Sequence, residues 1–140
     1  MNTDTGRIKV VLDTNILISA IGFDSNPRKV LNLVLERKIL AISSPSLRAE
    51  FEDVVFKKFP LLAKRFEKIN KQLKKAIKIV RPTISLNAVR DKTDNHVLEA
   101  AVEGKCNYVV TGDKDLLNLG SYGKIKIVTA TEFLSLLEKN

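Results

Sequence analysis

Short apolar runs alternate along the chain with longer segments in which apolar residues recur at helical spacing. Five such runs predict strands, at residues 10–12, 39–42, 78–80, 108–110 and 125–128. The amphipathic segments between them predict helices that begin near residues 14, 27, 45, 60, 94 and 130. Because strands and helices alternate, the pattern predicts a three-layer α/β/α sandwich around a mostly parallel, about five-stranded central sheet.

Two helix ends carry sequence signals of their own. Thr129 and Glu132 have the spacing of a capping box at the start of the last helix. Gly104 follows the apolar residues of the helix that begins near Asp94, and a glycine there predicts a left-handed residue that ends the helix.

The composition is typical of one globular domain, which we predict to span residues 7–140. Hydrophobic residues make up 44% of the chain and charged residues 29%, which argues against a disordered protein. No apolar run is long enough to cross a membrane, and residues 1–6 lack the apolar stretch of a signal peptide, so we expect a cytoplasmic protein without a membrane partner. The single cysteine, Cys106, excludes an internal disulfide and a cysteine-based metal site. Any metal must therefore be held by oxygen.

Positive charge is concentrated in one segment. The net charge is +8, and residues 57–78 are rich in lysine. One helical face of this segment is apolar, and the opposite face carries a stripe of lysines: Lys64, Lys68, Lys71, Lys75 and Lys78. Each lysine taken alone is best explained as part of a solvated surface. As a group, the first four predict a surface that binds a polyanion such as RNA.

Four acidic residues stand where a parallel α/β sheet collects ligands. Asp13 and Asp113 each follow a buried strand, Asp94 opens a helix, and Glu50 lies in the helix after the second strand. Taken alone, Asp13 is explained equally well as a helix cap and as an active-site residue. The equivalent position of Asp113 favours the active site.

A cluster of these four carboxylates requires a cation. Two unit charges roughly 4 Å apart repel by about 1 kcal/mol in water and by about 4 kcal/mol at an effective dielectric constant of about 20. A divalent ion removes this cost, and an all-oxygen site suits Mg²⁺ or Mn²⁺. Such ions activate water and orient phosphates, so the predicted reaction is phosphodiester hydrolysis.

The order and spacing of four motifs carry a family resemblance that covers residues 8–137. The motifs are Val11-Leu12-Asp13-Thr14-Asn15, Ser44-Pro45 followed by Glu50, Arg90-Asp91-Lys92-Thr93-Asp94-Asn95, and Thr111-Gly112-Asp113-Lys114-Asp115-Leu116. Together they resemble the PIN-domain ribonucleases, and in particular the VapC-like toxins of toxin–antitoxin systems. The resemblance implies a Mg²⁺- or Mn²⁺-dependent endoribonuclease that cuts single-stranded RNA, forms a homodimer and binds an antitoxin protein.

The resemblance also assigns roles to residues. It implies that Asp13, Glu50, Asp94 and Asp113 are catalytic and bind the metal directly or through water. Asn15 and Thr111 resemble polar supports that hold the first aspartate and the backbone of the site. Asp115 is expected to add an outer contact behind Asp113, and Asp91 to be a loop or cap residue.

Two other functions are compatible with parts of the sequence. A phosphatase of the haloacid dehalogenase type also places an aspartate after its first strand, but it needs a second aspartate two residues later, where this chain has Asn15. An RNA-binding or RNA-processing module of the same fold, with little or no toxin role, would keep the same acids. Metal binding and RNA cleavage separate these alternatives.

Overall fold

The computed structural model describes residues 6–139. Residues 1–5 and Asn140 lie outside this range. They include most of the amino-terminal segment that is expected to lack a signal peptide, and the last residue of the predicted domain. No helix within residues 6–139 is both long enough and apolar enough to cross a membrane.

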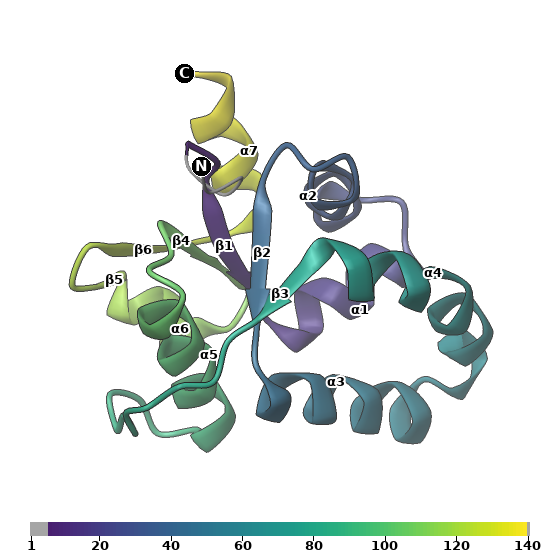
Figure 1. Cartoon of the computed structure of the whole chain (residues 1–140), viewed down its shortest axis with the longest axis horizontal. Coiled ribbons are helices and arrows are strands. Elements are labelled where there is room, and N and C mark those ends of the chain that lie inside the picture. Colours follow the sequence, from purple (N-terminus) through teal and green to yellow (C-terminus); the bar gives the residue numbers. More distant parts are fainter. Residues whose placement is uncertain (1–5, 140) are drawn as a thin grey trace.

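A six-stranded sheet forms the centre of the molecule, in the order β3-β2-β1-β4-β6-β5 (Figure 1). Its strands are β1 (Lys9–Leu12), β2 (Leu40–Ser43), β3 (Ile77–Ile79), β4 (Tyr108–Val110), β5 (Ser121–Tyr122) and β6 (Ile125–Val128). The pairings are parallel except for that of β5 with β6. The predicted fold class is confirmed. The sheet has one strand more than predicted, because β5 is a two-residue strand without an apolar run.

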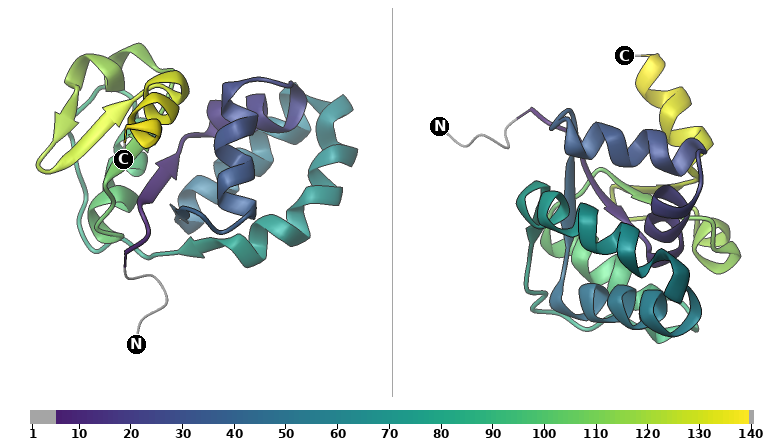
Figure 2. Two further views of the ribbon diagram at one scale, coloured as in Figure 1. Left: turned by 90° about the horizontal axis from the view of Figure 1, so that it is seen from above. Right: turned by 90° about the vertical axis from the view of Figure 1, so that its right-hand side faces the viewer.

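Helices cover both faces of the sheet (Figure 2). They are α1 (Thr14–Gly22), α2 (Asn26–Leu35), α3 (Pro45–Lys58), α4 (Ala63–Ala76), α5 (Lys92–Glu103), α6 (Lys114–Leu119) and α7 (Ala130–Glu138), with a short 3₁₀ helix at Pro60–Leu62. One core contains apolar residues of α1, α2, α4 and α7, and the other contains residues of α5 and α6. Helix α3 contributes Phe51 to the first core and Leu47 to the second, so it contacts both layers.

The alternation of side chains in β1 fixes the position of the residue that follows it. Val10 and Leu12 pack into one core and Val11 into the other, and all three are buried. The register pairs Leu12 with Val110 of β4, so both strands end at the same level. The backbone N–H of Asp13 then donates to the carbonyl of Val110 at 3.2 Å. Asp13 and the residues after Val110 therefore lie side by side.

The two predicted helix ends have different outcomes. The capping box of Thr129 and Glu132 is confirmed at the start of α7. Gly104 caps the end of α5, but its φ is −80°, so the prediction of a left-handed residue at position 104 is wrong. The next residue, Lys105, adopts the left-handed conformation instead, with a φ of 54°. A β-carbon at position 104 would lie 2.8 Å from Cγ2 of Ile42. Glycine is required there by close packing against β2.

Candidate active site

A cavity of about 310 Å³ lies at the carboxyl edge of the sheet. At this edge β1 and β4 end, and α3 and α5 contact each other; Figure 1 labels these elements. Five carboxylates line the cavity: Asp13, Glu50, Asp91, Asp94 and Asp113. The remaining lining residues are Thr14, Asn15, Val54, Lys58, Phe59, Thr93 and Val97. The structure thus brings together the four acids singled out in the sequence and adds a fifth, Asp91.

Asp13 is both a helix cap and a residue of the cavity wall. One carboxylate oxygen accepts from the backbone N–H of Ile16 at 2.9 Å, which caps α1. The other accepts from the hydroxyl of Thr111. Burial raises the pKa of Asp13 and the charge of Asp113 raises it further, while the bonds from Thr111 and Ile16 oppose the rise. The cap and the site wall are therefore two roles of one side chain.

Thr111 connects the ends of β1 and β4. Its fully buried hydroxyl donates to Asp13 and accepts from the backbone N–H of Asp113 at 3.0 Å. Asp113 in turn caps α6, because its carboxylate accepts from the backbone N–H of Leu116 at 3.0 Å. One hydroxyl thereby fixes the carboxylate of Asp13 relative to the backbone of Asp113.

Asp94 lies in the first turn of α5, half-buried beside Asp113. Helix α5 begins at its cap Asp91, whose carboxylate accepts from the backbone N–H groups of Thr93 and Asp94 at 2.8 and 3.3 Å. Burial raises the pKa of Asp94 to about 7, with further contributions from the charges of Asp113 and Asp91 and from a hydrogen bond with Asp113. Without a cation, the carboxyl group of Asp94 is therefore partly protonated at neutral pH.

Glu50 reaches the cavity from α3. The hydroxyl of Thr14 donates to its carboxylate at 3.4 Å. Burial raises the pKa of Glu50, the bond from Thr14 opposes the rise, and the charges of Asp91 and Asp13 add to it. The raised pKa makes Glu50 a stronger base than an exposed glutamate.

The loop before α5 is held in place by a residue whose role was not predicted. Asn95 is buried, its side-chain oxygen accepts from the backbone N–H groups of Ala88 and Val89, and its side-chain nitrogen donates to the carbonyl of Val89 at 2.8 Å. These bonds hold the loop that leads into Asp91. Asp91 was predicted to be either a loop residue or a helix cap, and it is a cap. Its position in the cavity wall was not predicted.

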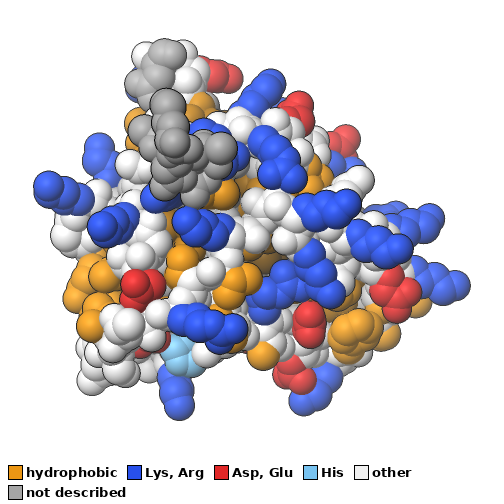
Figure 3. All heavy atoms as spheres, viewed as in Figure 1, with side chains coloured by type: hydrophobic (Ala, Val, Ile, Leu, Met, Phe, Trp, Pro, Cys, Tyr) orange, Lys and Arg blue, Asp and Glu red, His pale blue; other side chains and the backbone are white. Residues whose placement is uncertain are grey.

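Other predicted site residues lie elsewhere or make different contacts. Asp115 accepts from Arg90 at 3.2 Å and does not line the cavity. Asn15 is exposed and lines the cavity. Its backbone N–H, rather than its side chain, donates to Asp13. None of the four predicted RNA-binding lysines lines the cavity; all are exposed on α4: Lys64, Lys68, Lys71 and Lys75. Lys and Arg side chains gather on the face that carries α4 (Figure 3).

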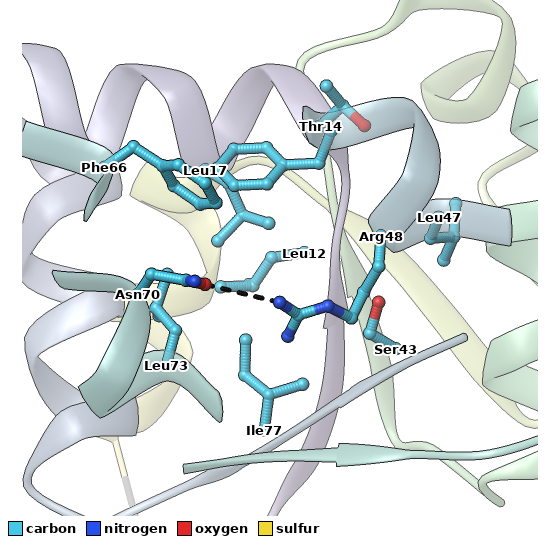
Figure 4. Close-up of a pocket in the computed structure, with 11 residues that line it drawn as sticks. Leu12, Thr14, Leu17, Ser43, Leu47, Arg48, Phe66, Asn70, Leu73 and Ile77 are labelled. Atoms are coloured by element: carbon cyan, nitrogen blue, oxygen red, sulfur yellow. Dashed lines mark hydrogen bonds between the residues drawn. The ribbon is translucent and has the colours of Figure 1, made fainter. Parts of the chain in front are cut away.

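A second, smaller cavity lies between α3, α4 and the sheet (Figure 4). Its volume of about 20 Å³ has room for about one water molecule. The guanidinium of Arg48 at its wall already donates to the side-chain oxygen of Asn70 at 3.3 Å and pairs with Glu52 at 3.7 Å. Because the rest of the lining is mainly apolar, this cavity is a packing feature of the first core.

The acidic cavity suits a cation that is held by few direct ligands. Within residues 6–139, no group of three or more His, Cys, Asp or Glu side chains is arranged to hold a metal ion. Mg²⁺ commonly takes one or two protein carboxylates and keeps several waters. Asp94 and Asp113 fit that requirement, since a cation beside them would take the place of the proton that Asp94 partly retains. Asp13 and Glu50 are available to waters around it.

Fold and site together define an α/β sandwich with a carboxylate-lined cavity at the carboxyl ends of its parallel strands. The model of the PIN domain family matches residues 9–115. An uncharacterized protein of Methanocaldococcus jannaschii is 36% identical over 149 aligned positions, which cover 95% of this chain and 94% of that protein. The chain therefore belongs to the PIN domain family, whose members are generally nucleases.

A solved structure shares the fold. It is the crystal structure of VapBC2 from Rickettsia felis bound to a DNA fragment from their promoter. One chain matches with a TM-score of 0.61 and 15% identity, covering 86% of this chain and 97% of that one. At this level of identity the match supports the fold alone.

Replacing Thr111 tests the connection between the strand ends. Thr111→Val keeps the shape of the side chain but leaves a buried oxygen of Asp13 without its donor, so we expect a loss of about 1–3 kcal/mol in the free energy of unfolding. Thr111→Ser keeps the hydroxyl and is expected to lose less. Urea denaturation at neutral pH measures both. Equal losses for the two variants would contradict the role of the hydroxyl.

The raised pKa of Asp94 predicts how the free energy of unfolding changes with pH in metal-free buffer. Between about pH 4 and pH 7, folded Asp94 binds more protons than unfolded Asp94, so its contribution to the free energy of unfolding falls as pH rises. Thermal melts in EDTA should show Asp94→Asn gaining stability relative to the parent protein as pH rises from 5 to 8. Asp115→Asn, outside the cavity, serves as control. If the melting temperatures of Asp94→Asn and the parent protein changed with pH in the same way, the raised pKa of Asp94 would be refuted.

Proposed function

We propose that this protein is a metal-dependent endoribonuclease that uses Mg²⁺ or Mn²⁺ to hydrolyse phosphodiester bonds of single-stranded RNA. The observation that carries the proposal is the gathering of five carboxylates in one cavity of a PIN-family chain whose net charge is +8. An acidic cavity in a basic protein suits a divalent cation at the centre and a polyanion around it.

Each carboxylate has a proposed part in the reaction. Asp94 and Asp113 would hold the cation once Asp94 has lost its proton, and Asp13 and Glu50 would contact it through water. When bound, the cation lowers the pKa of a water molecule and stabilises the leaving oxygen. Glu50 stands on the α3 side with a raised pKa and accepts the proton of the attacking water. Thr111 keeps Asp13 in position through its hydroxyl.

The basic surface has a proposed part in capturing RNA. Four exposed lysines follow one face of α4: Lys64, Lys68, Lys71 and Lys75. They lie outside the cavity, so they act on the backbone of a longer strand rather than on the reacting phosphate. Binding through them should weaken as salt concentration rises.

We further propose that the protein is the toxin of a toxin–antitoxin pair in the cytoplasm, acting as a homodimer. The support is the motif pattern of the sequence and the shared fold with a chain of the VapBC2 structure. The antitoxin would be a protein that covers the acidic cavity.

RNA cleavage is the direct test of the nuclease. Purified protein with Mn²⁺ should cut single-stranded RNA internally, and EDTA should abolish the reaction. Glu50→Gln and Asp94→Asn should each lower the initial rate by about 100-fold or more. Asp53→Asn is a matched control for Glu50, because Asp53 lies on the same helix but pairs with Lys57 on the surface at 3.0 Å.

Two results would overturn the proposal. One is the absence of cleavage by folded protein with either metal, which would favour an RNA-binding module without turnover. The other is cleavage that persists unchanged in Glu50→Gln and Asp94→Asn, which would indicate a contaminating nuclease. Gel electrophoresis of end-labelled RNA separates internal cutting from removal of terminal nucleotides.

A further inference from the structure

The end of α3 brings two residues of a different kind to the acidic cavity. Lys58 is the last residue of the helix and the single basic residue among those that line the cavity. Phe59, which follows it, is the single aromatic lining residue and is 38% exposed. Neither belongs to the carboxylate set, and nothing in the proposed hydrolysis uses them.

We infer that Lys58 and Phe59 bind one nucleotide of the RNA strand beside the acidic cavity, with the ring of Phe59 stacked on its base and the ammonium of Lys58 paired with its phosphate. The inference rests on the proposed function, because it assumes that RNA enters this cavity. It goes beyond that function by assigning a base-binding position and by requiring an unpaired base.

Electrostatics supports the assignment of Lys58. Five carboxylates in the cavity wall repel phosphates, so an RNA strand needs a cation at the edge of the cavity to approach it. Lys58 is exposed and forms no ion pair with any residue in the range 6–139. The preceding lysine differs: Lys57 pairs with Asp53 at 3.0 Å and does not line the cavity. Of these two neighbours, Lys58 is the one available to a ligand.

The backbone at Phe59 supports the assignment of the ring. Phe59 caps α3 with φ −132° and ψ 55°, and its N–H donates to the carbonyl of Val55 at 3.0 Å. The chain therefore leaves the helix at this residue, beside the cavity. Phe56, one turn earlier, packs edge-on against Phe66 with ring centroids 6.1 Å apart. Phe59 has no such ring partner within the described part of the chain.

Nucleic acid chemistry explains why the two residues stand together. Every base offers a flat face to an aromatic ring, and each nucleotide carries a phosphate near that base. In a duplex the base faces are already stacked, so a ring such as Phe59 can bind only an unpaired or displaced base. The pair therefore selects single strands by geometry rather than by sequence.

The experiment uses a short single-stranded RNA with one 2-aminopurine, bound to the full-length protein in Ca²⁺ to slow cleavage. Stacking should quench the fluorescence of 2-aminopurine, and Phe59→Leu should lose the quenching and bind about 5- to 100-fold more weakly. Phe59→Trp should retain both. Leu61→Ala is the matched control, because Leu61 is 94% exposed nearby and does not line the cavity.

Salt titration tests Lys58 separately. Lys58→Ala should reduce the slope of log affinity against log salt by about 0.7, the value for one phosphate contact on a single strand. Lys57→Ala should keep more of the parent slope, because Lys57 is already paired. Thermal melts verify that each variant is folded.

The outcomes distinguish this inference from the proposed nuclease. Quenching that depends on Phe59, without cleavage in Mn²⁺, would support the nucleotide position and overturn the nuclease. Cleavage with unchanged binding and quenching in Phe59→Leu would support the nuclease and overturn the nucleotide position, leaving the exposed ring to a protein partner. Absence of RNA binding by the parent protein would overturn both.

Discussion

The hydroxyl of Thr111 is the contact on which the geometry of the acidic cavity depends. It donates to Asp13 at the end of β1 and accepts from the backbone N–H of Asp113 after β4. The register of the sheet places these two strand ends side by side, but it does not orient their side chains. The hydroxyl orients the carboxylate of Asp13 and fixes the backbone of Asp113, and each of the two carboxylates also caps a helix, α1 and α6 respectively.

Repulsion between the carboxylates opposes the contacts of Thr111 and of the helix caps. The contacts that fix Asp13 and Asp113 also hold several carboxylates close together, and burial raises the pKa values of Asp13, Glu50 and Asp94. Such an arrangement is costly without a cation and favourable with one. A cation bound at the centre, as proposed, would relieve this cost. On the face seen in Figure 3, lysine and arginine side chains gather on the outer surface.

The sequence predicted the parts of the site that depend on local patterns. Asp13 and Asp113 each follow a run of β-branched residues, and such runs form buried parallel strands whose carboxyl ends share one edge. The position of Asp91 in the cavity wall depends on a loop that Asn95 holds from a distance, which no local pattern reveals. The sequence pattern predicts a left-handed residue at Gly104, whereas the reason for the glycine is its contact with Ile42, which lies far away in sequence.

The residues at the end of α3 were missed for a different reason. Lys58 and Phe59 belong to a basic, amphipathic stretch in which every lysine has the pattern of a solvated surface. Only the position of α3 across the edge of the sheet separates Lys58 from Lys57. Strand β5 has only two residues and is defined by its pairing with β6, so the periodicity of apolar residues could not predict it.

We propose that the carboxylates form a site for a divalent cation around Asp94 and Asp113. Anomalous diffraction from crystals grown with Mn²⁺ tests it most directly. We expect an anomalous peak in the acidic cavity within about 2.0–2.3 Å of carboxylate oxygens of Asp94 and Asp113. The peak should be absent from crystals of Asp94→Asn. A well-ordered cavity without a peak, or Mn²⁺ bound only at surface acids such as Asp53, would contradict the proposed cation site.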